Sequence, residues 1–432
     1  MTATPAEAGI QGARNRYVAL ALLIAVYTFN FLDRQIVSIL ATPIKAELHI
    51  SDGDYGLLSG LGFAIVYSLL AVPIALLADR YSRSWIITIS LAAWSGFTAL
   101  CGTAGGFASL FLFRTGVGVG EAGGVAPSYS LISDLFPARQ RARALAAYAF
   151  AIPLGTAAGL FVGAVIAAKW GWRPAFWTVG AAGLLLAPVF KLLVRDPATG
   201  AAAVQRRTQA ASLWTVAGLL LRKPSFWLIA FGAAMASTVG YGVAFWLPTF
   251  FQRSFSFTLL QSGMYTAGLT LIGGGAGIWL GGVLADRLGQ NRRGAYPLVP
   301  AVAFAIAIPA FYLASNIGDR TLAFLLFLIP TGLNLVWLGP LTTSVQHLVP
   351  ANMRATASAL FLLINNLFGI AVGLFYYGRV SDLLRPQFGA ESMRYSIYSG
   401  LGFYVVSAVL LLIASRTLKR DWVEEAPPPT IH

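Results

Sequence analysis

Charged residues are scarce in this chain of 432 residues, and their scarcity sets the class of protein. Asp, Glu, Lys and Arg make up 11% of the sequence, whereas hydrophobic residues make up 57%, and the mean hydropathy is +0.72. Soluble globular domains carry about 25% charged residues. A water-soluble domain is therefore excluded, and we expect the lipid bilayer to surround most of the chain.

Cysteine and histidine are also rare, which limits the available chemistry. The one cysteine, Cys101, lies within an apolar run, so the chain has neither a disulfide framework nor a thiolate metal site. His49 and His347 fall at the ends of apolar runs and His432 is the last residue, with no carboxylate at ligand spacing. We expect no metal and no cofactor, and a membrane-embedded enzyme is disfavoured because no catalytic residues are visible.

Long apolar runs are abundant instead. Each can form the helix of about 20 residues that crosses ~30 Å of hydrocarbon. They lie near residues 17–41, 55–78, 85–104, 107–133, 143–168, 174–194, 225–251, 261–285, 295–315, 321–346, 355–378 and 395–415. The sequence therefore predicts an all-α membrane protein with twelve transmembrane helices.

Polar stretches separate these runs into two sets of six. Between the sets, Asp196-Pro197, an Ala-rich patch and Arg206-Arg207 interrupt the hydropathy. The expected organisation is an N-terminal tail (1–16), a first six-helix half (17–194), a linker with an interfacial helix (195–224), a second six-helix half (225–415) and a C-terminal tail (416–432).

Two short motifs occur twice at nearly the same spacing. Leu77-Ala-Asp-Arg80 recurs as Leu284-Ala-Asp-Arg287, 207 residues later. Residues 135–146 recur as 348–359, 213 residues later, with seven identical positions of twelve. This duplication predicts two homologous halves, as in many secondary transporters, and a carrier explains it better than a channel does.

Positive charge is unevenly distributed among the loops. If both termini are cytoplasmic, twenty of the thirty lysines and arginines lie on the cytoplasmic side and eight on the opposite side, which leaves Arg34 and Arg114 inside the membrane. This follows the positive-inside rule, so the basic balance reflects topology, and no nucleic-acid partner is expected. Residues 1–16 lack the apolar core of a signal peptide. We predict a multi-pass protein of the inner (plasma) membrane with both termini cytoplasmic.

Four charged residues fall well within predicted spans: Asp33 and Arg34 in the first, Arg114 and Glu121 in the fourth. An ionised side chain at mid-membrane costs about 2.5–3.5 kcal/mol, so each one is a functional candidate. Arg114 and Glu121 are two helical turns apart and share one face. Asp33 and Arg34 are adjacent and do not face each other, so at least one of them requires a partner on another helix, and Glu121 is available.

These groups suggest proton coupling. Burial raises the pKa of a carboxyl group and a nearby arginine lowers it, so a conformational change that exchanges these surroundings would load and release a proton. We interpret Asp33 and Glu121 as the proton-coupling residues; the alternative is a static buried ion pair that fixes two helices. Arg34 and Arg114 either hold an anionic substrate group or only compensate charge.

The second half has no acidic residue within any predicted span. Its interior polar residues are Asn334, Asn365 and Asn366. Together with Asn30 of the first half, these amides are candidates for substrate binding or charge compensation. Proton chemistry is therefore expected in the first half.

The repeated loops resemble the signature of the major facilitator superfamily. The matching residues are Asp79-Arg80-x-x-Arg83 in the first copy and Gly282-x-x-x-Asp286-Arg287 with Arg292-Arg293 in the second, and Ala75 replaces the usual glycine of the first copy. The resemblance implies a cytoplasmic gate in which these loops hold the two halves together in the outward-open state, with Asp134 as an ion-pair partner. Arg114, followed by glycines, resembles the family's helix 4 arginine motif.

A narrower resemblance covers about residues 30–163. Asn30-Phe-Leu-Asp33-Arg34, Arg114-x-Gly-x-Gly-x-Gly-Glu121-Ala and Phe150-Ala-Ile-Pro-Leu-Gly155 are similar to the spinster-like branch, whose animal members move sphingosine-1-phosphate and lysophospholipids. The resemblance carries the branch's Asp-Arg pair and helix 4 glutamate onto Asp33, Arg34 and Glu121. Short loops and compact length suggest a bacterial member.

We therefore predict a monomeric secondary transporter that works by alternating access and is coupled to protons. The expected substrate is an amphipathic anion such as a lysolipid, because buried arginines would meet a headgroup and apolar walls an acyl chain. The alternative within the same fold is a drug or organic-anion transporter.

Overall fold

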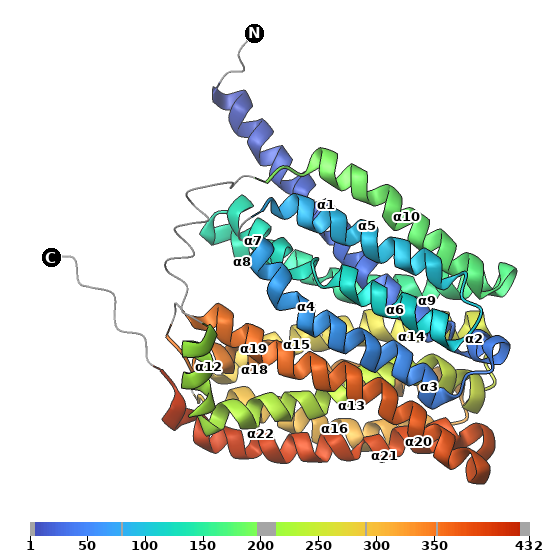
Figure 1. Cartoon of the computed structure of the whole chain (residues 1–432). Helices are drawn as coiled ribbons and strands as arrows, with labels where there is room; N and C mark the ends of the chain where they lie inside the picture. Colours follow the sequence, from blue (N-terminus) through green and yellow to red (C-terminus); the bar gives the residue numbers. More distant parts are fainter. Residues whose placement is uncertain (1–4, 79–80, 197–212, 290–291, 351–352, 424–432) are drawn as a thin grey trace. The chain divides into compact units, whose positions relative to one another are not determined.

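The computed structural model describes residues 5–78, 81–196, 213–289, 292–350 and 353–423, and every regular element in these ranges is a helix (Figure 1). The prediction of an all-α protein is confirmed. Contacts divide the chain into two units. Unit 1 comprises Met1–Arg207 with Phe245–Leu271, and unit 2 comprises Thr208–Ala244 with Ile272–His432. The boundaries predicted from the sequence, 17–194 and 225–415, differ from this grouping mainly in residues 245–271.

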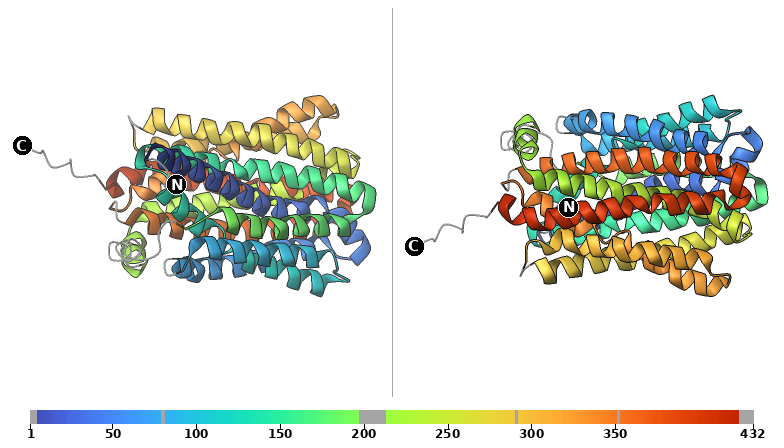
Figure 2. Two further views of the ribbon diagram at one scale, coloured as in Figure 1. Left: turned by 90° about the horizontal axis from the view of Figure 1, so that it is seen from above. Right: turned by 90° about the horizontal axis from the view of Figure 1, so that it is seen from below.

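Unit 1 is built from helices that run alongside one another (Figures 1 and 2). Its elements are α1 (Pro5–Ile39), α2 (Ala41–Leu48), α3 (Asp52–Gly56), η1 (Leu57–Gly62), α4 (Phe63–Ala78), α5 (Arg83–Cys101), α6 (Phe107–Glu121), α7 (Val125–Leu135), α8 (Ala138–Ala149), α9 (Ala151–Trp170), α10 (Trp172–Leu193), the last part of α13 (Pro224–Ser254) and α14 (Leu259–Leu269). Within it, α9 packs on α1 and on α14, and α5 packs on α6 and on α10.

Unit 2 is likewise built from helices that pack against one another. Its elements are α12 (Leu213–Leu221), the first part of α13, α15 (Gly275–Gly289), α16 (Ala295–Asn316), α17 (Arg320–Leu333), α18 (Leu338–Gln346), α19 (Arg354–Asn366), η4 (Leu367–Val372), α20 (Gly373–Phe388), η5 (Gly389–Glu391), α21 (Ser392–Gly400) and α22 (Gly402–Asp421). Here α16 packs on α17 and α22. The helix expected in the linker is present as α12, with Val216 and Leu220 buried and Trp214 exposed.

All of the segments predicted to cross the membrane lie on helices. Among the described residues, ten helical stretches are long and apolar enough to span a bilayer, and one of them, Thr356–Asp421, contains two of the predicted segments. The predicted segment 107–133 is divided between α6 and α7 by a turn at 122–124, so neither helix is long enough by itself. The number of twelve spans remains a prediction.

Short π-helical segments interrupt three of the long helices. They are η1, η2 (Thr270–Gly274) and η4, and each contains glycine. A π-helical segment turns the following residues to a different face of the helix and often occurs at functional sites. In unit 1 the segment η1 ends immediately before Phe63, which lies beside the buried charges described below.

Glycines bring α9 against α1. A Cβ atom at Gly159 would lie 2.6 Å from the carbonyl oxygen of Leu32, and one at Gly155 would overlap the carbonyl oxygen of Thr28. The helix axes therefore approach more closely than side chains would allow. Gly155 and Gly159 therefore serve helix packing in unit 1.

Replacement of Gly159 by alanine is expected to destabilise the protein. The added methyl group meets backbone, which cannot rotate away, so the helices must separate at a cost of about 1–3 kcal/mol. Gly96→Ala on α5 is the matched control, because a Cβ there has no atom within 4 Å. Thermal unfolding of the two variants in detergent measures the difference, and equal midpoints would contradict the packing argument.

Candidate functional site

The four buried charges predicted from the sequence lie together in unit 1, on α1 and α6. Asp33 is 1% exposed, Arg114 2% and Glu121 0%. The Nε atom of Arg34 donates a hydrogen bond to Oε2 of Glu121 at 2.7 Å, and the Arg34 side chain is 15% exposed. The predicted pairing of a charge on the first helix with Glu121 is confirmed.

The second carboxyl group of the cluster belongs to Asp33. Asp33 interacts electrostatically with Glu121 and Arg114 and lies beside Thr98 of α5, and Asn30 lies beside Glu121. Within the described part of the chain, several buried polar atoms here lack a hydrogen-bond partner. They belong to Asn30, Asp33 (Oδ1), Thr98, Arg114 (Nε and Nη1) and Glu121 (Oε1). Buried polar groups normally find partners, so this cluster is unusual in the interior of the unit.

Aromatic rings surround the guanidinium group of Arg34, a feature that the sequence analysis did not identify. The Cζ atom of Arg34 lies 5.4 Å from the ring centroid of Phe31, 4.9 Å from that of Phe63 and 5.0 Å from that of Tyr67. The Cζ atom of Arg114 lies 5.6 Å from the centroid of Phe63. These distances are within the range of cation–π attraction.

A second charged cluster joins three helix ends at the arginine-rich end of unit 1. Arg83, at the start of α5, donates to Asp134 of α7 at 2.6 Å and to Asp196, which follows α10, at 2.5 Å. Its Nη1 also donates to Ser130, and its backbone N–H donates to Asp196 at 2.6 Å. The expected role of Asp134 as an ion-pair partner is confirmed, whereas Asp196 was missed because it follows the last apolar residue of its helix.

The structure describes only some of the other residues predicted for the cytoplasmic gate. Asp79, Arg80 and the side chain of Asp286 lie outside the described residues. Arg287 and Arg292 are exposed. Their gating role remains a prediction.

The corresponding end of unit 2 uses aromatic contacts instead. Trp422, directly after α22, stacks on His347 with ring centroids 4.1 Å apart and on Tyr296 at 5.8 Å, and Arg293 lies 5.4 Å from the Trp422 ring. In the repeat, His347 occupies the position of Asp134, because each precedes the repeated Leu-x-Pro-Ala sequence. The two copies of the loop thus hold their neighbouring helix ends by different chemistry.

A third cluster lies at the opposite end of unit 1. Asp52, 1% exposed at the start of α3, accepts hydrogen bonds from Arg253 of α13 at 2.7 and 2.8 Å and pairs with Lys45 of α2. All three residues lie outside the membrane segments predicted from the sequence. The sequence gives no signal for this cluster, because Arg253 is 201 residues away from Asp52.

Glu47 forms a further connection at the same end. It accepts hydrogen bonds from the indole N–H of Trp172 and from Arg173, and Arg173 also donates to the carbonyl of Ala104. The Trp172 hydrogen bond, followed by that of Arg173, holds the pKa of Glu47 below its ordinary value. This connection between α2 and α10 therefore persists at neutral pH.

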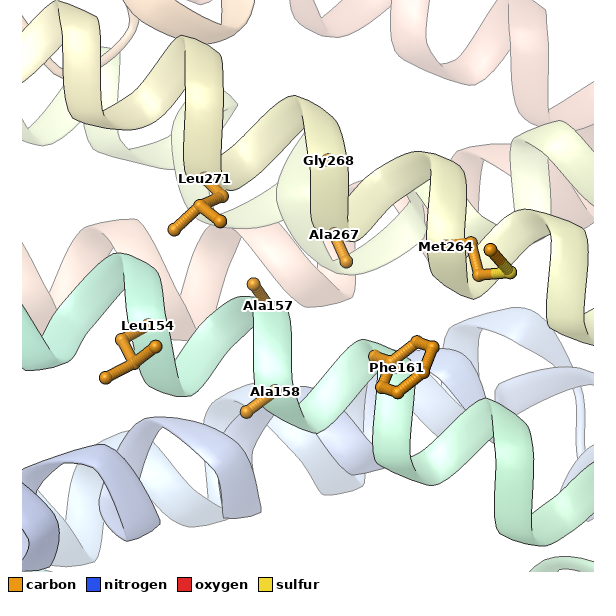
Figure 3. A pocket seen from close by; sticks show the side chains of 8 residues that line it. All are labelled: Leu154, Ala157, Ala158, Phe161, Met264, Ala267, Gly268 and Leu271. Carbon is orange, nitrogen blue, oxygen red and sulfur yellow. The ribbon is translucent and has the colours of Figure 1, made fainter.

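An apolar groove runs between α9 and α14 in unit 1 (Figure 3). Its volume is about 330 Å³, and its lining residues are Leu154, Ala157, Ala158, Phe161, Met264, Ala267, Gly268 and Leu271. In Figure 3, Ala157 points from α9 towards α14, and Ala267 and Leu271 point back towards α9. Phe161 and Met264 are largely exposed, so the groove opens to the surroundings of the helices.

The predicted amides of unit 2 connect helices. Asn365 is 1% exposed and accepts from Ser237 at 2.7 Å, and Asn366 accepts from Tyr241 at 3.3 Å. Asn334 accepts from Tyr404 at 2.9 Å. Their oxygen atoms therefore contribute to helix packing in this unit, and a role in substrate binding remains a prediction.

Comparisons with known proteins agree with this architecture. A model described as Major Facilitator Superfamily matches residues 23–374. An MFS-type efflux pump of Mycolicibacterium smegmatis is 34% identical over 418 residues, which cover 96% of each chain. Protein spinster homolog 1 of Homo sapiens is 29% identical over 412 residues, covering 89% of this chain and 77% of that protein.

A solved structure is also similar. It is a bacterial homologue of the human lysosomal transporter Spinster in an inward-facing and unoccupied conformation. It matches with a TM-score of 0.85 and 28% identity, covering 95% of this chain and 99% of that chain.

The Arg83 cluster generates a stability prediction. Arg83→Ala removes the cation that the buried carboxylates of Asp134 and Asp196 share, so we expect a loss of about 3–5 kcal/mol. The control is Arg420→Ala, whose side chain is 68% exposed, and which should cost about 0–1 kcal/mol. Thermal unfolding in detergent distinguishes the two, and comparable losses would show that the Arg83 cluster contributes no more than a surface pair.

Proposed function

The chain belongs to the major facilitator superfamily as a spinster-like member, and on this basis we propose that it is a proton-coupled carrier of amphipathic anions such as lysolipids. It is a multi-pass membrane transporter and not an enzyme, since its relatives are transporters. The proton coupling and the class of substrate are the proposal. Its main support is the buried ion pair between Arg34 and Glu121.

Charge balance explains how this pair couples a proton to an anion. With Asp33 and Glu121 ionised, the two carboxylates balance the guanidinium groups of Arg34 and Arg114. Protonation of Glu121 leaves one positive charge in excess and frees Arg34, whose side chain is partly exposed, to bind an anion. The guanidinium group suits phosphate and carboxylate through paired hydrogen bonds. Proton and anion therefore favour each other's binding.

Asp33 is the second proposed proton-coupling residue. It is as deeply buried as Glu121 and interacts with both Glu121 and Arg114. In this proposal Arg114 compensates the negative charge of the carboxylates, and Asn30 is a neighbouring amide of the same cluster. The amides of unit 2, Asn334, Asn365 and Asn366, are proposed to act on the substrate only where a rearrangement releases them from their present partners.

The groove between α9 and α14 supports an amphipathic substrate. Because Gly155 of α9 meets Thr28 and Gly159 meets Leu32, the groove residues 154–161 lie alongside α1 up to the level of Asp33 and Arg34, which Phe161 reaches. An acyl chain in the groove would thus lie at the depth of the charged cluster. A carrier of drugs or organic anions is the second candidate, favoured by the efflux pump at 34% identity.

The topology completes the proposal. The distribution of positive charge supports our placing both termini in the cytoplasm. The protein is further proposed to act as a monomer in the plasma membrane of a bacterium. The cytoplasmic gate is then formed by residues of both halves. They are Asp79, Arg80, Arg83 and Asp134 in the first half, and Asp286, Arg287, Arg292 and Arg293 in the second. Alternating access of the halves 17–194 and 225–415 would open and close this gate.

Proteoliposome flux tests the proton coupling. A panel of lysolipids, organic anions and drugs is measured with and without a pH gradient. We expect lysolipid uptake to follow the gradient, and Glu121→Gln and Asp33→Asn to abolish gradient-driven accumulation while downhill exchange continues. Glu391→Gln, at a half-buried site outside the charged cluster, is the control. Unchanged pH dependence in both buried variants would refute the assignment, and saturation by a plain carboxylate would favour the organic-anion carrier.

The groove generates a prediction about acyl-chain length. Ala157→Leu narrows the groove and Phe161→Ala widens it, so the preferred chain length should shorten in the first variant and lengthen in the second. Competition between lysolipids of different chain length for uptake measures the shift. Ala181→Leu, at an exposed position of α10, is the control for added bulk on a helix surface. If the two groove variants keep the wild-type preference, the acyl chain binds elsewhere.

A further inference from the structure

The ring of Phe63 lies between the two buried guanidinium groups. It is the first residue of α4 and is 1% exposed. Arg34 of α1 lies 4.9 Å from its centroid, and Arg114 of α6 lies 5.6 Å from it. One neutral side chain is thus in contact with both cations of the cluster.

The surrounding helices fix the position of this ring. A Cβ atom at Gly118 of α6 would lie 3.0 Å from the carbonyl oxygen of Phe63 and 3.3 Å from its ring, so α4 rests on α6 at this glycine. The ring also stacks on Tyr67 with centroids 5.6 Å apart and an interplanar angle of 13°. The π-helical segment η1 ends at Gly62 and sets the helical face that Phe63 occupies.

We infer that Phe63 is a positioning residue for proton coupling, and that its ring holds Arg34 in place when Glu121 is neutral. The inference rests on the proposed function. The ring attracts a guanidinium group through its quadrupole, which does not change with pH, whereas the attraction of Glu121 ends when the carboxylate takes up a proton. Arg34 would otherwise remain as a poorly solvated cation in a low-dielectric interior.

This difference determines the direction in which loss of the Phe63 ring shifts the pH dependence of transport. Loss of the ring destabilises the state with protonated Glu121 more than the state with the intact ion pair, because only in the first state has Arg34 lost the attraction of the Glu121 carboxylate. Protonation then requires more acid, so the pH midpoint of transport moves to lower pH. The other charged or titratable groups around the pair are Asp33 and Tyr27 on α1, Arg114 on α6 and Tyr67 on α4. Arg114 and Tyr67 also contact the Phe63 ring, and these contacts are lost in both protonation states of Glu121.

Fluorinated phenylalanines at position 63 test the inference with minimal change in shape. Each added fluorine weakens the negative face of the ring, so the midpoint should move stepwise to lower pH, and Phe63→Leu should move it by about one pH unit, which corresponds to a tenfold change in proton affinity. Phe63→Tyr should restore the wild-type midpoint. The control is the same series at Phe190 of α10, a buried ring with no guanidinium group near it among the described residues. An unchanged midpoint across the series at position 63 would overturn the inference.

A double-mutant cycle separates this inference from the proposed function. In thermal unfolding, Phe63→Leu should lower the midpoint more in the Glu121→Gln background than in the wild type, because Arg34 there has lost the Glu121 carboxylate and depends more on the rings. If this result is found together with transport that does not depend on pH, proton coupling is refuted but the role of the ring is retained. Equal effects in both backgrounds would show that Phe63 only fills space.

Discussion

The ion pair between Arg34 and Glu121 is the interaction on which the rest of the structure depends. Both charges lie in the interior of a membrane protein, where an unpaired charge is costly, so neither can lose its partner without a replacement. The surrounding features supply replacements: Asp33 and Arg114 balance the charge, and the rings of Phe31, Phe63 and Tyr67 hold the guanidinium group. The proposed proton-coupled cycle requires such replacements whenever Glu121 is neutral.

The repeated loops show how duplicated halves diverge while keeping a common task. In unit 1, Arg83 holds three helix ends through Asp134 and Asp196. In unit 2, Trp422 holds the corresponding region through His347, Tyr296 and Arg293. The ionic arrangement depends on complementary charge, whereas the aromatic one depends mainly on stacking and buried area.

Much of the fold and part of the site followed from the sequence. The helices were predictable because hydropathy and length decide which segments span a bilayer, and the pairing of Arg34 with Glu121 followed because a buried charge needs a partner. Asp196 and Asp52 were not predictable, because their burial depends on which helix ends meet in space. Phe63 was not predictable either, since one phenylalanine among 28 carries no signal until the helix breaks and Gly118 place it between two arginines.

The central claim is that anion binding at Arg34 and protonation of Glu121 occur together. Infrared difference spectroscopy on the reconstituted protein measures this directly, by recording the carboxyl band of Glu121 before and after substrate is added. The account predicts that substrate produces a protonated carboxyl band that is absent in Glu121→Gln, because the anion displaces the carboxylate from Arg34 and linkage is reciprocal. Substrate binding at full affinity without this band would contradict it.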